Sequence, residues 1–124
     1  MPDILLEICC GSADDAVEAA RGGADRVELN SNLFQGGLTP TAGTLQVVKE
    51  QTEIPVMAMI RPRAGGFCYT DNEFAAARAD ARILLDHGVK VIQGDAVARP
   101  MRLIDLALTN IKPVPKVKKD GENK

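Results

Sequence analysis

The chain has 124 residues, 45% of them hydrophobic and 26% charged, with a formal net charge of −2. This composition is typical of one globular domain, and the near-zero charge argues against nucleic-acid and membrane partners, which recruit basic surfaces. No apolar run approaches the roughly 20 residues that a membrane span needs. The N-terminus also lacks the basic segment of a signal peptide.

The chain has three cysteines, an odd number. Cys9 and Cys10 are adjacent and Cys68 is remote, so no disulfide framework is implied, and we expect reduced thiols in the cytoplasm. Aromatic residues make up only 3% of the chain and Trp is absent. We therefore expect an aliphatic core and few side chains that could stack on nucleobases.

Apolar runs and helix signals alternate from the start of the chain. Residues 4–10 are predicted to form a buried strand. Ser12, with Asp15 three residues later, is typical of a helix start, and that helix should end at Gly22. A second strand is expected at 26–30.

A polar loop follows at 31–37, and Thr39-Pro40 is typical of a helix cap with proline in the first helical position. This helix should run to about Glu53, with Leu45 and Val48 on its buried side. The Gly36-Gly37 turn at its start could bind an anion or simply connect strand and helix.

Residues 54–60 are predicted to form the third strand, with Pro55 at its start. Thr70 and Glu73 form a capping box for a helix over 71–86. A fourth strand is expected at 89–94 and a fourth helix over 101–108. These elements define a domain at 1–110, followed by a basic, disordered tail at 111–124.

The order of elements predicts an α/β fold with parallel strands and right-handed helical crossovers. Periodicity alone leaves two options, an open doubly wound sheet or part of a (β/α) barrel. No G-x-G-x-x-G follows the first strand, which weakens the dinucleotide-binding option. A full barrel takes about 250 residues, and this chain has about half of that.

Polar side chains recur in phase at the ends of three predicted strands, where parallel α/β sheets bind ligands. They are Glu7, Cys9, Glu28, Asn30, Arg61 and Arg63. One hypothesis is a structural network in which the two glutamates and two arginines neutralise one another. The other is a pocket in which the arginines bind a small anion and either glutamate acts as an acid or base.

Metal binding has limited support from the residues alone. Cys9 could supply a soft thiolate to Cu(I), with Met57 or Met59 as thioether partners, but buried Cys and Met are also ordinary core residues. Adjacent strand residues point to opposite faces, so Cys9 and Cys10 cannot easily chelate one ion. His87, the only histidine, suits a helix C-terminus, so a zinc site or a Ser-His-Asp triad has little support.

Four motifs resemble, in order and spacing, those of the CutC family, over about residues 4 to 88. They are Leu6-Glu7-Ile8-Cys9, Gly23-Ala24-Asp25-Arg26-Val27-Glu28-Leu29, Gly36-Gly37-Leu38-Thr39-Pro40 and the segment from Ile60 to Tyr69. The resemblance implies a (β/α) TIM-barrel-type fold, here about half a barrel of four βα units. It also implies a cytoplasmic homo-oligomer that takes part in copper homeostasis, with a Cu(I)-binding role for cysteines.

By position, Cys9 matches one of the family's strand-end cysteines, whereas Asn30 stands where the second would be. Cys68 or a methionine would have to replace that ligand. Ala64-Gly65-Gly66 replaces the more usual Gly-Gly-Asp, and the resemblance fades after Gly88. A half-barrel leaves apolar strand surface uncovered, so we expect self-association.

Three hypotheses about function follow. The first is a CutC-like protein of copper homeostasis that binds Cu(I) through Cys9. The second is an enzyme or binding protein for a small anionic metabolite that uses the strand-end Glu and Arg side chains, and the third is a truncated product without an intact site. The sequence does not decide whether the protein is an enzyme.

Overall fold

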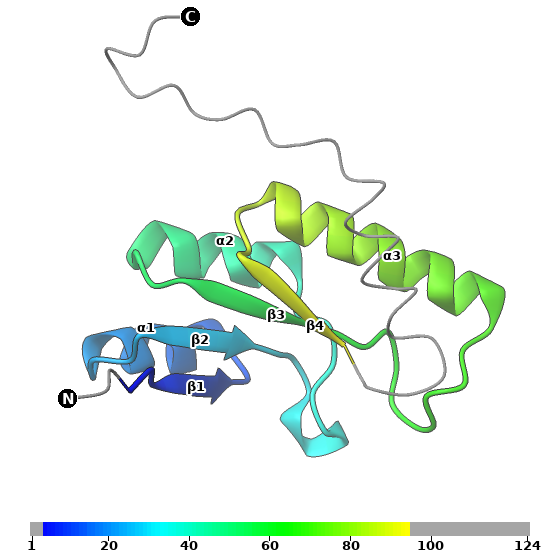
Figure 1. The fold of residues 1–124 in the computed structure, drawn as a ribbon, viewed down its shortest axis with the longest axis horizontal. Coiled ribbons are helices and arrows are strands. Elements are labelled where there is room, and N and C mark those ends of the chain that lie inside the picture. Colours follow the sequence, from blue (N-terminus) through cyan, green and yellow to red (C-terminus); the bar gives the residue numbers. More distant parts are fainter. Residues whose placement is uncertain (1–3, 95–124) are drawn as a thin grey trace, which may run out of the picture.

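The computed structural model describes residues 4–94, which form a four-stranded parallel sheet covered by helices (Figure 1). The elements in chain order are β1 (Glu7–Cys10), α1 (Ala13–Arg21), β2 (Arg26–Leu29), the 3-10 helix η1 (Leu33–Gln35), α2 (Ala42–Gln51), β3 (Val56–Ile60), α3 (Asp71–Asp86) and β4 (Val91–Gly94). No helix within residues 4–94 has both the length and the apolar character to cross a membrane. The helix expected at 101–108 and the tail expected at 111–124 lie outside the described residues.

The strands lie in the order β1-β2-β3-β4, and each is parallel to the next. When every crossover steps in the same direction with the same hand, all helices lie on one face of the sheet. Figure 1 shows α1, α2 and α3 together on one side. A doubly wound sheet reverses its strand order and carries helices on both faces, so that alternative does not describe residues 4–94.

The core lies between the helices and one face of the sheet. Alternate strand residues supply the sheet side, among them Leu29, Val56 and Ile60, each at most 1% exposed. Leu45 and Val48, the predicted buried side of α2, face them from the helix layer and are fully buried. Burying one such side chain stabilises the fold by about 1.5–3 kcal/mol, so this single face of the sheet holds the described residues together.

Two of the three predicted helix caps are confirmed. Ser12 Oγ accepts a hydrogen bond from the backbone N–H of Asp15 at 3.1 Å, and Thr70 with Glu73 forms the complete capping box of α3. The cap predicted at Thr39 is wrong. The helix begins after Thr41, whose Oγ1 accepts from the backbone N–H of Thr44 at 3.1 Å.

Thr39 is instead bonded to the end of β3. Its N–H donates to the carbonyl oxygen of Arg61 at 3.0 Å, and its Oγ1 accepts from the N–H of Arg61 at 2.9 Å. These two bonds fasten the β2–α2 loop to the sheet, so α2 starts two residues later than the sequence predicts.

The predicted strands are longer than the observed ones at their ends. The first begins at Glu7 rather than at residue 4, and Ile4, Leu5 and Leu6 are largely exposed beside it. Leu6 is nevertheless held, because its N–H donates to the Asp25 carboxylate at 2.7 Å and its carbonyl accepts from the N–H of Asp25 at 2.9 Å.

Candidate functional site

The face of the sheet opposite the helices carries the polar side chains of β1 and β2. The parallel register sets Glu7 opposite Arg26 and Cys9 opposite Glu28. Glu7 and Arg26 form a partly exposed ion pair. Glu7 therefore has its charge partner on the neighbouring strand and does not depend on Arg61 or Arg63.

Cys9, Glu28 and Asn30 form one cluster at the carboxyl ends of β1 and β2, which we call the Cys9 cluster. The Asn30 amide nitrogen lies 3.1 Å from Glu28 Oε1 and 3.4 Å from Cys9 Sγ, and it donates toward both. Cys9 Sγ is 3.9 Å from Glu28 Oε1, a long contact even for a thiol. The sequence prediction that these three side chains share a face is confirmed by these contacts.

Asn30 is the anchor of this cluster, because it is only 1% exposed. The β2–α2 loop fixes its position: a Cβ atom at Gly37 would lie 2.5 Å from Asn30 Oδ1. Gly37 also has a φ of +93°, a region that favours glycine. The loop can thus close over Asn30 only with glycine at position 37.

The two adjacent cysteines differ in accessibility and in acidity. Cys9 is exposed, whereas Cys10 is fully buried in the core. Burial raises the pKa of the Cys10 thiol to about 11, with a smaller contribution from Asp15. Partial burial, and then the charge of Glu28, raise the pKa of Cys9 as well. Cys10 is therefore a core side chain, and Cys9 is the accessible thiol of the sheet, mainly protonated at neutral pH.

Arg61 lies just beyond the end of β3, where the strand alternation no longer sets its direction. Its guanidinium donates to the carbonyl oxygens of Gln35 at 2.7 Å and Gly65 at 3.0 Å, and it stacks over the Phe67 ring at 4.9 Å. These contacts join the β2–α2 loop to the β3–α3 loop. Arg61 is only 8% exposed, so it is a buried side chain that connects the two loops.

Arg63 is held within the β3–α3 loop. Its guanidinium binds both carboxylate oxygens of Glu73, at 2.6 and 3.1 Å, and donates to the carbonyl oxygens of Gly66 and Cys68. The hydrogen bonds from Arg63 lower the pKa of Glu73, and the reciprocal bonds to Glu73 raise the pKa of Arg63. The arginine orders the loop that leads into α3, and Cys68 is exposed in that loop.

The four-residue network predicted from Glu7, Glu28, Arg61 and Arg63 is therefore wrong in its pairing. The charge partners are Arg26 for Glu7 and Glu73 for Arg63. Arg26 was not among the candidate side chains that the sequence suggested. A register for β1 and β2 would have found the pair, because Arg26 lies directly opposite Glu7.

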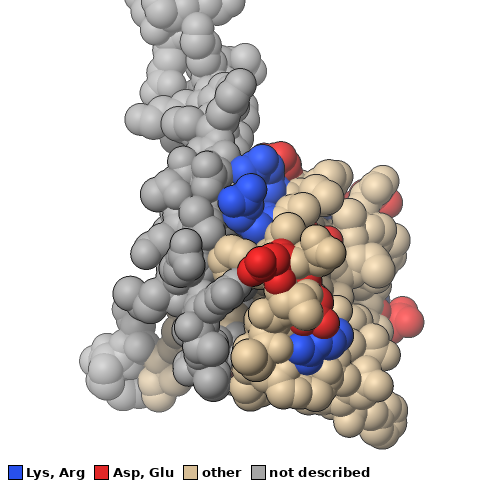
Figure 2. Space-filling view, turned by 90° about the vertical axis from the view of Figure 1, so that its right-hand side faces the viewer, with Lys and Arg blue, Asp and Glu red and all other residues tan. Residues whose placement is uncertain are grey.

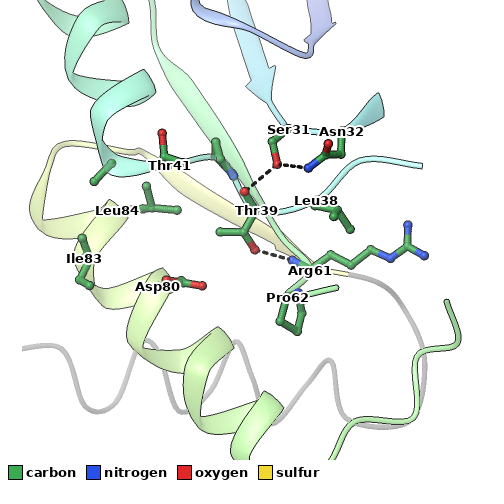
Figure 3. A pocket seen from close by; sticks show the side chains of 12 residues that line it. Ser31, Asn32, Leu38, Thr39, Thr41, Arg61, Pro62, Asp80, Ile83 and Leu84 are labelled. Atoms are coloured by element: carbon green, nitrogen blue, oxygen red, sulfur yellow. Dashed lines mark hydrogen bonds between the residues drawn. The ribbon is translucent and has the colours of Figure 1, made fainter. Parts of the chain in front are cut away.

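A separate pocket of about 510 Å³ lies on the helix side, between the start of α2, the end of β3 and α3 (Figure 3). Thr39, Asp80 and Leu84 line it, and desolvation raises the pKa of the Asp80 carboxyl. Figure 3 shows the Arg61 guanidinium pointing away from Asp80. Asp80 is the one acidic residue in this lining, and its carboxylate would repel an anion. The pocket therefore gives no support to anion binding beside Gly36-Gly37.

No group of three or more His, Cys, Asp or Glu side chains within residues 4–94 is arranged to hold a metal ion. Met57, considered above as a thioether partner, is opposite Glu28 and 4% exposed, so a glutamate lies between it and Cys9 in the sheet. On the face seen in Figure 2, acidic and basic side chains lie in small groups, and the described residues there form no continuous basic patch.

Comparisons with known proteins decide the family. The model of the CutC family matches residues 4–112. The chain belongs to the CutC family. The match runs to residue 112 and so includes residues after Gly88, where the resemblance in the sequence motifs fades.

Curated members of the CutC family are closely similar over about 70% of the chain. A family protein CutC of Treponema denticola is 53% identical over 88 residues, which cover 71% of this chain and 36% of that protein. The human copper homeostasis protein cutC homolog is 52% identical over 84 residues, covering 68% of this chain and 31% of the human protein. The chain thus spans about a third of these relatives.

The fold agrees with a solved structure of the family. A crystal structure of a CutC protein from Streptococcus agalactiae superposes with a TM-score of 0.73 at 28% identity, covering 91% of this chain and 57% of that one. The parallel α/β arrangement described above is therefore that of a CutC protein.

Proposed function

We propose that this chain acts in copper homeostasis and holds Cu(I) as cargo on the Cys9 thiolate. The human and mouse relatives are named copper homeostasis protein cutC homologs, which supports the first part. The observation that carries the second part is the exposed Cys9 thiol at the carboxyl end of β1. Thiolates are soft ligands that select Cu(I).

The surroundings of Cys9 make this a weak and exchangeable site. Asn30, whose position the family resemblance assigns to a second cysteine, offers an amide rather than a soft donor. Cu(I) must also displace the thiol proton, which the neighbouring Glu28 helps to retain. Once the ion is bound, the same carboxylate stabilises its positive charge. One protein thiolate then suits the transfer of copper better than its storage.

A Cu(I) titration against a competing chromogenic chelator tests the proposal. Cys9→Ser should weaken binding at least tenfold, and Cys68→Ser is the matched control, because both thiols are exposed and only Cys9 belongs to the Cys9 cluster. Equal affinity of the wild type and Cys9→Ser would remove Cys9 from the site. It would favour the hypothesis of a product without an intact site.

We also propose that the four strands are half of a (β/α) barrel in a cytoplasmic protein. One-directional strand order and one-sided helices are what a barrel requires. The free state of all three cysteines suits a reducing compartment.

The alternative of a small anionic ligand stays a hypothesis without a favouring observation. It needs guanidinium groups that face a ligand, and those of Arg61 and Arg63 are bonded to loop carbonyls and to Glu73. An acid–base role for Glu7 or Glu28 likewise lacks a favouring observation, because neither residue lines the pocket described above.

A further inference from the structure

Asp80 is a partly buried acid at the edge of the side of α3 that packs on the sheet. Ala77 and Leu84, close to it on the same side, are at most 2% exposed. The positions three and four residues before and after it are occupied by Ala76, Ala77, Ile83 and Leu84. These are the helix positions that can contact Asp80, so α3 provides no basic side chain to pair with its carboxylate.

The surroundings of this carboxylate cost stability rather than add to it. Burial raises the pKa of Asp80, and among the described residues no hydrogen bond or neighbouring charge opposes that shift. A carboxylate that loses water and gains no partner favours its neutral form. Glu7 and Glu73, in contrast, each have an arginine partner. Folding alone therefore does not explain an acid at position 80, whereas a ligand of opposite charge would.

Asp80 forms part of the wall of the pocket of about 510 Å³ on the helix side. The other walls come from the β2–α2 loop, the start of α2 and the end of β3, so the pocket lies away from both edges of the sheet. In Figure 3 the Asp80 side chain points from α3 toward the side on which Thr39 and Pro62 lie. Apolar side chains make up much of the remaining lining, and they are those of Leu38, Pro40, Pro62, Ile83 and Leu84.

We propose that this pocket binds a small organic cation, made of one primary ammonium group on a compact apolar body. The ammonium group would donate to the Asp80 carboxylate, and the apolar body would contact Pro62 and Leu84. The volume is within the range of small-molecule sites. Arg61 does not compete for the carboxylate, because its guanidinium points away and donates to loop carbonyls. One carboxylate in the lining favours a ligand with a single positive charge.

The charge preference is tested by titrating the full chain and recording amide NMR spectra at constant ionic strength. Three probes share a cyclohexyl ring and differ in charge: cyclohexylammonium, cyclohexanol and cyclohexanecarboxylate. The ammonium probe should shift the signals of Thr39 and Leu84 and bind more tightly than the alcohol, and the carboxylate should not bind. Equal affinity for the ammonium and the alcohol, or no binding of either, would overturn the proposal.

Two substitutions on α3 test the role of Asp80. Asp80→Asn should weaken the binding of cyclohexylammonium about tenfold and remove its advantage over cyclohexanol. Asp86→Asn is the matched control, because it removes the same charge from an exposed position at the end of α3. Equal weakening by both would mean that the charge acts from a distance, which contradicts contact between the ligand and Asp80.

Urea denaturation distinguishes a binding role from a structural one. Asp80→Asn should unfold at the same urea concentration as the wild type or at a higher one, because it removes a desolvated charge. Lower stability would show that the carboxylate holds the fold and would contradict the proposal.

A substitution that fills the pocket tests its location. Ala42→Leu adds volume to the lining from the first residue of α2 and leaves Asp80 in place, so it should block the binding of cyclohexylammonium. Unchanged binding would place the ligand elsewhere. The pocket lies on the helix side and the Cys9 cluster on the opposite face of the sheet. Copper affinity is measured separately, so failure here leaves the Cys9 proposal intact, and the reverse also holds.

Discussion

The two faces of this sheet are formed by the same four strands but differ in polarity and exposure. The face toward the helices is apolar and closed, with side chains such as Leu29 and Ile60 almost completely buried. The opposite face carries an ion pair and the Cys9 cluster, and its thiol is exposed. Neighbouring residues of a strand point to opposite faces. A residue that stabilises the core is therefore followed along the strand by one that lies on the polar face. Substitutions on adjacent positions should therefore have different consequences.

The largest effect is expected on the closed face. Leu29→Ala removes a fully buried side chain and should lower the free energy of unfolding by about 2–5 kcal/mol. Urea denaturation followed by circular dichroism measures this loss. Glu28→Gln, one residue earlier on the open face, is the control and should change stability far less. A similar loss for both would contradict the separation of the two faces.

A smaller effect is expected where a loop covers the open face. Gly37→Ala would force a side chain against Asn30 Oδ1 and into a left-handed backbone conformation, at a cost of about 1–3 kcal/mol. Gly66→Ala is the matched control, because a Cβ there meets nothing within 4 Å. Thermal unfolding of the two variants gives the comparison, and equal stability would show that the loop does not hold Asn30.

The smallest change is one of reactivity rather than stability. Glu28 raises the pKa of Cys9, so Glu28→Gln should lower that pKa and increase the thiolate fraction at neutral pH. The larger thiolate fraction should speed alkylation at pH values below the thiol pKa. Mass spectrometry of iodoacetamide labelling against pH measures it, with Cys68 of the same sample as an internal reference. A profile that stays in place, or moves to higher pH, would remove Glu28 from the control of Cys9.

Much of the fold could be predicted from the sequence, because local signals and packing agree. Leu45 and Val48 lie on the buried side of their helix as the spacing indicates, and Thr70 with Glu73 caps α3 as expected. The cap of α2 could not be predicted, because Thr39 and Thr41 are both competent N-caps. The choice depends on the bonds between Thr39 and Arg61, which are 22 residues apart.

The directions of the candidate side chains could be predicted only in or directly beside the regular strands. Strand alternation correctly places three side chains on one face, those of Glu7, Cys9 and Glu28. Asn30 comes directly after β2 and lies on the same face. Arg61 and Arg63 follow the last residue of β3, and there the loops decide the direction of a side chain. Their partners, among them Glu73 and the carbonyl of Gln35, come from segments that no periodicity brings together.

The simple strand order also bears on how the chain acquires its fold during synthesis. Within residues 4–94, each strand pairs with the strand just before it in the sequence. Because domains form from the N-terminus as the ribosome proceeds, the strands can pair in the order in which they are synthesised. β1, α1 and β2 can associate first, and each later strand then joins the edge that its predecessor has left open. A polypeptide built in this order can reach an ordered intermediate after each unit.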